Sequence, residues 1–275
     1  MKKKKTYAIA GAIVLGLILL IYILPILSLL INSFKPYGEI MDSFIALPKA
    51  FTLENYPKAW KALDFIRSSG NSVIMTVITL VLLLGTTMPA AYQLSRSRTK
   101  LGKFLFNFFT MPYLIPFFAV MIPVVKLARD FHLNNSLLGV SVVNVGISGS
   151  FAIIMFCGFV KSIPRELDEA AYVDGCGKFQ VFTKIIVPLL KPAISSVTIV
   201  YSLWTWNNFM LPFLMLTDRP KQTLIIRVFD LFGMYGTDWE VVIAALILVS
   251  APIIILYAVF QKYIIGGLTS GAVKG

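Results

Sequence analysis

The residue types that carry out covalent chemistry form no catalytic pattern in this sequence. The one histidine, His132, has no His-Glu-x-x-His spacing around it, and neither Gly-x-Ser-x-Gly nor paired carboxylates within an apolar stretch occur. A Gly-x-x-x-x-Gly-Lys-Ser/Thr phosphate loop is also absent, so the chain is not expected to hydrolyse ATP. We predict that the protein is not an enzyme, with no catalytic residue, no metal site and no cofactor of its own.

Residues 161–192 contain the pattern of a short helix with marked ends. Ser162 is expected to cap this helix and Pro164 to occupy its first turn, where amide donors are spare. The acids at 166, 168 and 169 complement the positive end of the helix dipole. Gly175 and Gly177 are expected to supply the left-handed backbone that ends such a helix.

The surface expected on this helix is small and mildly apolar. Leu167, Ala170 and Ala171 stand at i, i+3 and i+4, so they are predicted to share one face. Such a face allows close approach to another protein, with the flanking acids pairing with basic residues there. An amphipathic helix lying on the membrane surface is an equally good interpretation of the same pattern.

The elements that must position this segment are membrane spans. With 57% hydrophobic and 14% charged residues, and a mean hydropathy of +0.81, the chain has more apolar surface than a soluble core of this size hides. A spanning helix needs about 20 mostly apolar residues. Six stretches qualify, and we therefore predict an all-α membrane protein with about six transmembrane helices rather than six buried helices of a soluble one. They run from Tyr7 to Phe34, Asn71 to Leu94, Phe104 to Val125, Leu137 to Val160, Ala193 to Leu216 and Val241 to Phe260.

The distribution of basic residues predicts the orientation. Residues 2–5 are lysines, but the apolar run after them is too long for a signal peptide and has no small-x-small cleavage pattern. Of 25 Lys and Arg residues, 15 fall on the side of the N-terminus, with only four of the 13 acids. Both termini and residues 161–192 are therefore expected in the cytoplasm. The net charge of +12 then reflects topology and contact with anionic lipid, without nucleic acid.

One membrane domain over residues 1–275 is the simplest organisation, because no linker or fixed-period repeat interrupts the chain. Residues 35–70 mix aromatic side chains with charges of both signs, which predicts short helices at the outer surface. They serve either as a cap on the helix bundle or as a place where a partner docks.

These patterns resemble the permease subunits of binding-protein-dependent ABC importers. The run Glu169-Ala170-Ala171, followed by Asp174-Gly175, is similar to the EAA loop of that superfamily. Further matching pieces resemble the second permease of carbohydrate importers of the maltose and multiple-sugar type, and they extend over nearly the whole chain. They are Ser33-Phe34-Lys35-Pro36, Thr52-Leu53-Glu54-Asn55-Tyr56, Ala90-Ala91-Tyr92, Thr205-Trp206-Asn207, Tyr235-Gly236-Thr237-Asp238-Trp239 and the C-terminal residues 267–275.

The resemblance implies a type I importer permease in a bacterial or archaeal cell membrane, with a cytoplasmic coupling helix. It implies that Glu169, Ala170, Ala171, Asp174 and Gly175 dock on an ATPase subunit. ATP and Mg²⁺ would then be used by that partner. The implied assembly holds this chain, a second homologous permease, two cytoplasmic ATPases and an extracytoplasmic sugar-binding protein, and this chain forms half of the path for a sugar or oligosaccharide. The resemblance leaves the identity of the sugar open.

For the sugar path, we expect polar and aromatic groups on the fifth span. Trp204, Asn207 and Asn208 would share one helix face, and Pro212 would free the carbonyl of Asn208 beside it. Sugar hydroxyls bond to amides, and a sugar ring stacks on indole. The alternative is that these amides only bond to a neighbouring helix.

Asn144 and Ser148 on the fourth span are further candidates of the same kind. An ion-coupled secondary transporter is the alternative function. Such a transporter generally needs an acid or base within its spans, and the predicted spans hold none.

Overall fold

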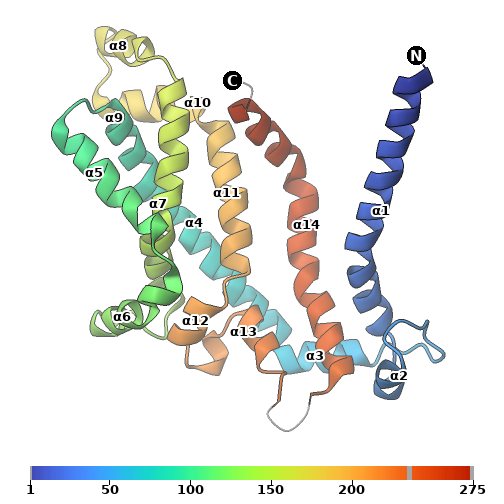
Figure 1. Cartoon of the computed structure of the whole chain (residues 1–275). Coiled ribbons are helices and arrows are strands. Elements are labelled where there is room, and N and C mark those ends of the chain that lie inside the picture. Colours follow the sequence, from blue (N-terminus) through green and yellow to red (C-terminus); the bar gives the residue numbers. More distant parts are fainter. Residues whose placement is uncertain (1, 234–236, 273–275) are drawn as a thin grey trace. The chain divides into compact units, whose positions relative to one another are not determined.

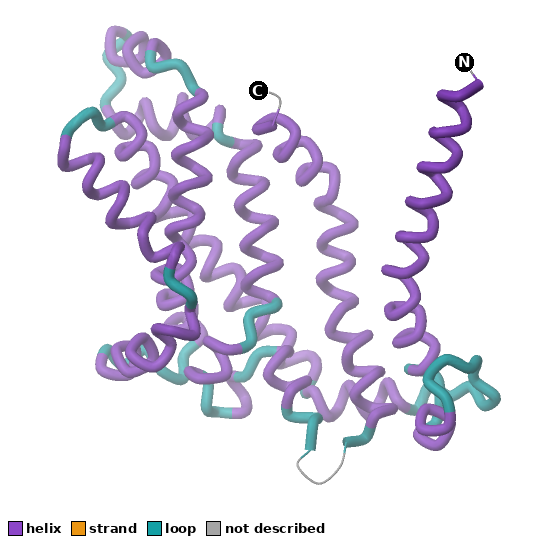
Figure 2. The backbone as a smooth tube through the Cα atoms, viewed as in Figure 1, coloured by secondary structure: helices purple, strands orange, loops and turns teal. Residues whose placement is uncertain are grey.

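The computed structural model describes residues 2–233 and 237–272, and it is helical over most of this length with no strand among these residues (Figures 1 and 2). The matched pieces at 235–236 and 273–275 lie outside the described residues. The chain forms two compact units, one made of residues 1–65 and 227–252 and the other of residues 66–226 and 253–275.

The first unit joins an apolar helix to a folded polar loop. Its helices are α1 (Lys2–Asn32), α2 (Tyr37–Asp42), α3 (Asn55–Leu63), the end of α13 (Leu224–Phe229) and the start of α14 (Trp239–Ala272). α2 and α3 confirm that residues 35–70 form short helices, and their position at the outer surface stays a prediction. Asn55 Nδ2 donates to the carbonyls of Ser33 and Lys35, and Lys35 Nζ donates to that of Ser43, so buried polar groups hold this loop together.

The second unit holds the remaining helices. They are α4 (Phe65–Arg96, which begins at the boundary), α5 (Lys100–Thr110), η1 (Met111–Leu114), α6 (Phe117–Asp130), α7 (Leu137–Ser162), α8 (Glu166–Val173), α9 (Lys178–Gln180), the π-helix η2 (Val181–Ile186), α10 (Val187–Leu189), α11 (Lys191–Trp206), α12 (Met210–Met215) and η3 (Arg219–Lys221). One apolar core joins α4, α7, α8, η2 and α11, with Tyr92, Phe156, Ala171 and Val197 among its buried members.

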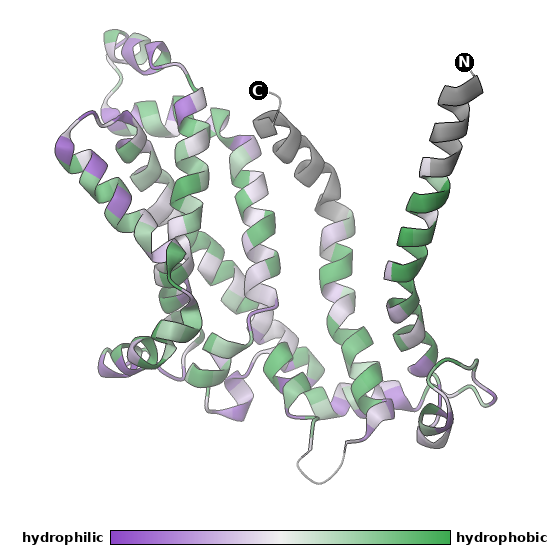
Figure 3. Ribbon diagram, in the orientation of Figure 1, coloured by the Kyte–Doolittle hydropathy of each residue, from purple (hydrophilic) through white to green (hydrophobic). Residues whose placement is uncertain are grey.

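All six predicted spans are helical, but only some are continuous. Among the described residues, three helices are long and apolar enough to cross a bilayer, namely Gly11–Asn32, Phe65–Arg96 and Leu137–Ser162. Two further candidates are bent pairs, and residues Trp239–Ile255 of α14 form a shorter apolar stretch. Figure 3 shows the apolar character of these helices and the hydrophilic residues gathered at α8 and at the start of α5.

The prediction of one straight helix from Phe104 to Val125 is wrong. The chain bends by 108° between residues 100–114 and 117–130. Pro112 lies in the short 3-10 turn η1, and Pro116 takes an extended backbone before α6. Because proline lacks an amide donor and fixes its backbone, two prolines four residues apart end one helix and start the next. Pro123 stays inside α6.

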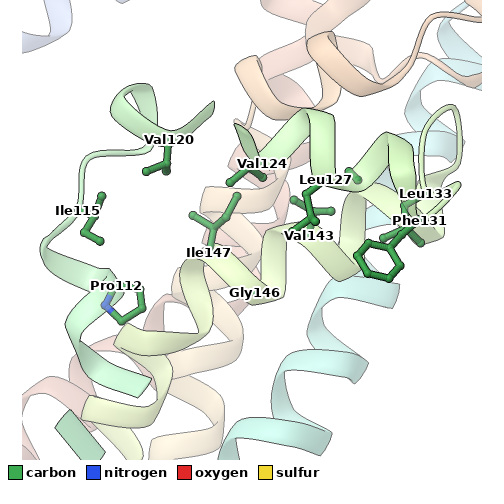
Figure 4. A pocket seen from close by; sticks show the side chains of 11 residues that line it. Pro112, Ile115, Val120, Val124, Leu127, Phe131, Leu133, Val143, Gly146 and Ile147 are labelled. Carbon is green, nitrogen blue, oxygen red and sulfur yellow. The ribbon is translucent and has the colours of Figure 1, made fainter. Parts of the chain in front are cut away.

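An apolar cavity of about 370 Å³ lies between the bent pair and α7 (Figure 4). Figure 4 shows Pro112 and Ile115 on one side of it and Val143, Gly146 and Ile147 of α7 on another. The break in the third span therefore leaves open space beside α7.

The predicted fifth span, Ala193 to Leu216, is also not one helix. α11 meets the preceding helices at a bend of 73° and ends at Trp206. Asn207 caps its C-terminus, and a separate helix, α12, starts at Met210. This break changes the surroundings of the predicted sugar-path residues.

Candidate functional site

The helix predicted in residues 161–192 exists as α8, with different ends from those expected. Ser162 is the last residue of α7, and Arg165 precedes α8 as its N-cap without a side-chain capping bond. The capping prediction for Ser162 is therefore wrong, because α7 continues two residues past the apolar stretch. Gly175 has φ of +80°, which confirms its left-handed role. Gly177 has φ of −71° and instead caps α9, so its predicted role is wrong.

The two sides of α8 differ sharply in burial. Asp168 and Ala171, three residues apart, are 6% and 5% exposed and face the core. The opposite surface is exposed and carries Glu166, Leu167, Glu169, Ala170, Val173, Asp174 and, just past the helix, Gly175. The prediction that Leu167, Ala170 and Ala171 share one free face is wrong, because Ala171 packs in the same core as Tyr92 and Val181.

A buried ion pair joins α8 to the end of α4. Arg96 Nε lies 2.5 Å from Asp168 Oδ2, and the side chains are 14% and 8% exposed. The Arg96 guanidinium also lies 6.0 Å from the centre of the Tyr92 ring. Removing one partner of a buried pair leaves the other charge uncompensated, at a cost of about 3–5 kcal/mol. Sequence reasoning missed this pair, because Arg96 is one of several basic residues after an apolar stretch.

Two arginines cap helix ends that face each other at this place. Arg96 Nη1 donates to the Ile163 carbonyl just after α7, at 3.1 Å. Arg165 donates in return to the carbonyls of Ser95 and Arg96 at the end of α4, both at 3.2 Å. The last carbonyls of a helix have no partner within the helix, and cations are favoured there. The ends of α4 and α7 are thus tied to the start of α8.

A cavity of about 200 Å³ lies where α4 and α8 meet, and it is lined by side chains of both positive and negative charge. Its lining consists of Tyr92, Gln93, Arg96, Arg165, Asp168, Glu169, Tyr172 and Lys178. Glu169, from the matched Glu-Ala-Ala run, is therefore at the border between this cavity and the exposed side of α8.

The predicted sugar-path residues do not share a helix face. Trp204 lies on α11, whereas Asn207 caps that helix and Asn208 lies beyond it. The amide lost at Pro212 falls in the first turn of α12, where no helical acceptor is required, so it frees no carbonyl of α11. The premise of a continuous helix was wrong.

The structure nevertheless brings Asn144 and Asn208 together. Asn208 Nδ2 donates to Asn144 Oδ1 at 3.4 Å, and Asn144 Nδ2 donates to Thr205 Oγ1 at 3.5 Å. Asn144 is only 8% exposed. Its amide therefore bonds α7 to the end of α11. Asn207 is exposed, and its side chain donates to the Leu203 carbonyl of its own helix.

Trp204 belongs to a row of aromatic rings from three elements. Tyr113 of η1 stacks on Phe151 of α7, Phe151 lies against Trp204 of α11, and Trp204 lies against Tyr201, each at 5.3 Å between ring centres. The Tyr201 hydroxyl donates to the carbonyl of Ser148, the other predicted residue of α7. Tyr113 also lines a cavity of about 470 Å³ with polar groups from Asn107 and Thr110.

We call Tyr113, Phe151, Trp204 and Tyr201 the aromatic row. Trp204 and Tyr113 are each about half exposed, at 49% and 52%. Tyr113 and Phe151 were not predicted as site residues, because the bend at η1 brings Tyr113 to α7. Three prolines in the third span were the only sequence signal of that bend.

At the other end of this unit, polar residues join the loops. Asn71 Nδ2 donates to the carbonyls of Pro220 and Gln222, and the amide of Asp218 donates to Asn135 Oδ1. Hydrogen bonds from Asn135 and Lys221 lower the pKa of the exposed Asp218 carboxyl. The unit thus has α8 at one end and an interlocked set of loops at the other.

The fold and the site define a class: an all-helical, multi-pass membrane protein that presents a short acidic helix outside its apolar part. The family model of the inner membrane component of binding-protein-dependent transport systems matches residues 82–269. A probable starch degradation products transport system permease protein of Thermoanaerobacterium thermosulfurigenes is 34% identical over 94% of this chain and 95% of its own length. A melibiose/raffinose/stachyose import permease protein of Bacillus subtilis is 32% identical, with 92% of each chain covered.

A solved structure of a bacterial ABC transporter involved in the import of the acidic polysaccharide alginate has the same fold. Its TM-score is 0.83 at 24% identity, covering 96% of this chain and 98% of that chain. This protein belongs to the family of inner membrane components of binding-protein-dependent transport systems. It is a transport subunit, as predicted, and the family favours an ABC importer over an ion-coupled secondary transporter.

Proposed function

We propose that this chain is the permease half of a sugar or oligosaccharide importer and that α8 is its docking helix for a separate ATPase. The exposed acidic surface of α8 carries this proposal. Glu169, Ala170, Asp174 and Gly175 are all exposed, whereas the side of α8 that holds Asp168 and Ala171 is buried in the same chain. An exposed surface at the end of a rigid bundle is suited to receive a partner.

The cargo class is supported by the relatives, whose names specify starch degradation products in one case and melibiose, raffinose and stachyose in the other. Within the aromatic row, the half-exposed rings of Trp204 and Tyr113 give this chain a surface with the right chemistry, because the apolar face of a sugar ring stacks on exposed aromatic rings, whereas Tyr201 is buried behind them. Trp204, Asn144, Asn207 and Asn208 stay path candidates, and the bonds of Asn144 and Asn208 favour a role in joining helices as well.

The remaining partners follow from the family. The chain would pair with a second homologous permease and with two cytoplasmic ATPases that use ATP and Mg²⁺. An extracytoplasmic sugar-binding protein would deliver cargo to the opposite side of the membrane. Alternating access in this assembly would open the path to one side at a time. One permease domain over residues 1–275, with residues 161–192 as its coupling loop, completes the proposal.

The positive-inside rule supports cytoplasmic termini and a cytoplasmic α8 in a bacterial or archaeal membrane. The test is to label Val173→Cys, made in a Cys176→Ala background, with a membrane-impermeant thiol reagent. Val173 is 88% exposed, so labelling is expected in inside-out vesicles. Labelling in right-side-out vesicles alone would contradict this orientation.

Replacing Gly175 tests the docking role. At φ of +80° a valine is strained, and it adds bulk to the exposed end of α8. We expect Gly175→Val to abolish ATP-driven uptake of labelled oligosaccharide by the assembled complex while the chain stays in the membrane. Gly177→Val is the matched control, because Gly177 has an ordinary φ of −71° and an added Cβ meets only the end of the Gln180 side chain, at 4.0 Å. Normal uptake by Gly175→Val would refute the docking role.

A further inference from the structure

The ion pair between Arg96 and Asp168 connects α8 to a helix that is not its neighbour in the chain. The polypeptide joins α8 only to α7, through residues 163–165, and to α9, through residues 174–177. The link to α4 rests on side chains alone. It includes the ion pair at 2.5 Å, the two bonds from Arg165 to the carbonyls of Ser95 and Arg96, and the packing of Ala171 in the core that holds Tyr92.

The covalent connections of α8 are poor transmitters of force by comparison. On its C-terminal side, the chain passes through the left-handed Gly175 before α9 begins. On its N-terminal side, Ile163 has an extended backbone, and Pro164 follows it. Turns of this kind change their dihedral angles more readily than a packed helix does. A push on α8 therefore reaches the rest of the unit through side-chain contacts, which are the packing of Ala171 beside Val181 of η2 and the contacts with the end of α4.

We propose that Arg96 and Asp168 form a latch that makes α8 move together with the end of α4, so that α4 is the span that first receives the movement of the docking helix. This inference rests on the proposed docking function of α8. It assigns positioning roles to two residues that would not touch the sugar or the ATPase. The Arg96 side chain connects its own helix α4 to α8 through the ion pair with Asp168. It also connects α4 to the end of α7, because it donates to the Ile163 carbonyl.

Two features suit the ion pair to transmitting movement from α8 to α4: its burial, and the side of α8 on which Asp168 lies. A pair that is 14% and 8% exposed is little screened by solvent ions, so its geometry is held more firmly than that of a surface pair. Asp168 lies on the same side of α8 as Ala171, which packs in the core. The ion pair and this apolar contact therefore hold α8 from one side and leave its other side for a partner.

Three variants test the latch in the reconstituted complex with its ATPase, a second permease and a sugar-binding protein. Asp168→Asn removes the charge and keeps the shape. Arg96→Lys keeps the charge and loses the planar set of donors. The double variant Arg96→Met with Asp168→Leu replaces the pair by apolar side chains, which often preserves the stability of a buried site. Arg98→Lys is the matched control, because Arg98 lies two residues from Arg96 and is exposed.

The readout is the amount of ATP hydrolysed for each sugar imported, measured on complexes purified through another subunit. We expect the three latch variants to assemble and to hydrolyse ATP, with uptake reduced about tenfold, a typical size for a coupling effect. The ratio of ATP to sugar would rise by the same factor, and Arg98→Lys would leave it unchanged.

An unchanged ratio in all three latch variants would overturn the latch, and so would their loss from the assembled complex, which would show a role in folding alone. Gly175→Val, run in parallel, separates this failure from that of the docking role. If Gly175→Val blocks uptake while the latch variants import normally, only the latch is refuted. If all of them import normally, the docking function of α8 is refuted.

Discussion

The end of the second unit at α8 and the aromatic row differ in how their residues are brought together. At α8, the exposed residues come from one continuous stretch, and one helix is enough to present them. The aromatic row takes its members from η1, α7 and α11, and it exists only because the third span bends. The proposed docking surface is thus local in sequence, whereas the surface proposed for cargo is assembled from distant segments.

The sharpest way to test this comparison lies within α8 itself. Ala171→Leu adds three carbons to a core residue that is 5% exposed, so overpacking should lower the free energy of unfolding by about 1–3 kcal/mol and abolish uptake. Thermal unfolding in detergent measures the first effect and vesicle uptake the second. Ala170→Leu, on the exposed side of the same helix, is the control and should leave the thermal transition unchanged. Equal destabilisation by both variants would contradict the assigned faces.

Trp204→Ala tests whether the aromatic row handles cargo. Loss of one stacking partner worth about 0.5–1.5 kcal/mol should reduce uptake about two- to tenfold. Trp204 is half exposed, so its removal should change the thermal transition little. Phe213, another half-exposed aromatic residue of the same unit, provides the control in Phe213→Ala. Identical uptake rates for Trp204→Ala and the parent would show that the aromatic row does not contact cargo.

Substitutions of Asn144 and Asn207 distinguish contact with cargo from a role in joining helices. Asn144→Leu removes the amide that bonds Thr205 and Asn208, and intramembrane bonds of this kind are worth about 0.6–2 kcal/mol. We expect the thermal transition temperature to fall for Asn144→Leu. It should not change for Asn207→Leu, because the Asn207 amide donates to the Leu203 carbonyl of its own helix. A fall in uptake for Asn207→Leu without a change in stability would instead place Asn207 on the path.

The smallest effect is expected at Asp218. Hydrogen bonds from Asn135 and Lys221 lower the pKa of the Asp218 carboxyl, so the ionised carboxyl stabilises the fold. This stabilisation is present at neutral pH and is lost as pH falls through the folded-state pKa. The carboxyl is fully exposed, and we expect Asp218→Asn to leave uptake and the thermal transition at pH 7 nearly unchanged. Below neutral pH, the thermal transition temperature of the variant should fall less steeply with decreasing pH than that of the parent. A large change at pH 7 would show that these loops do more than connect helices.

The sequence alone determined the membrane character, the helical class and the short helix before Gly175. These features depend on composition and on local rules, since twenty apolar residues need a bilayer and a left-handed turn favours glycine. The family resemblance was equally readable, because its matched pieces are short runs of neighbouring residues. Even the acids of α8 were identified as a group by their position in the first turn.

Only the tertiary structure decided which side of α8 is free, where the third and fifth spans break, and which partner Arg96 has. Asp168 and Glu169 are adjacent acids, yet one is buried in an ion pair with α4 and the other is exposed. Composition cannot separate them, because burial depends on where α4 ends relative to α8. The same reason applies to Tyr113, which reaches Phe151 through a bend that prolines permit but whose direction is set by packing against α7.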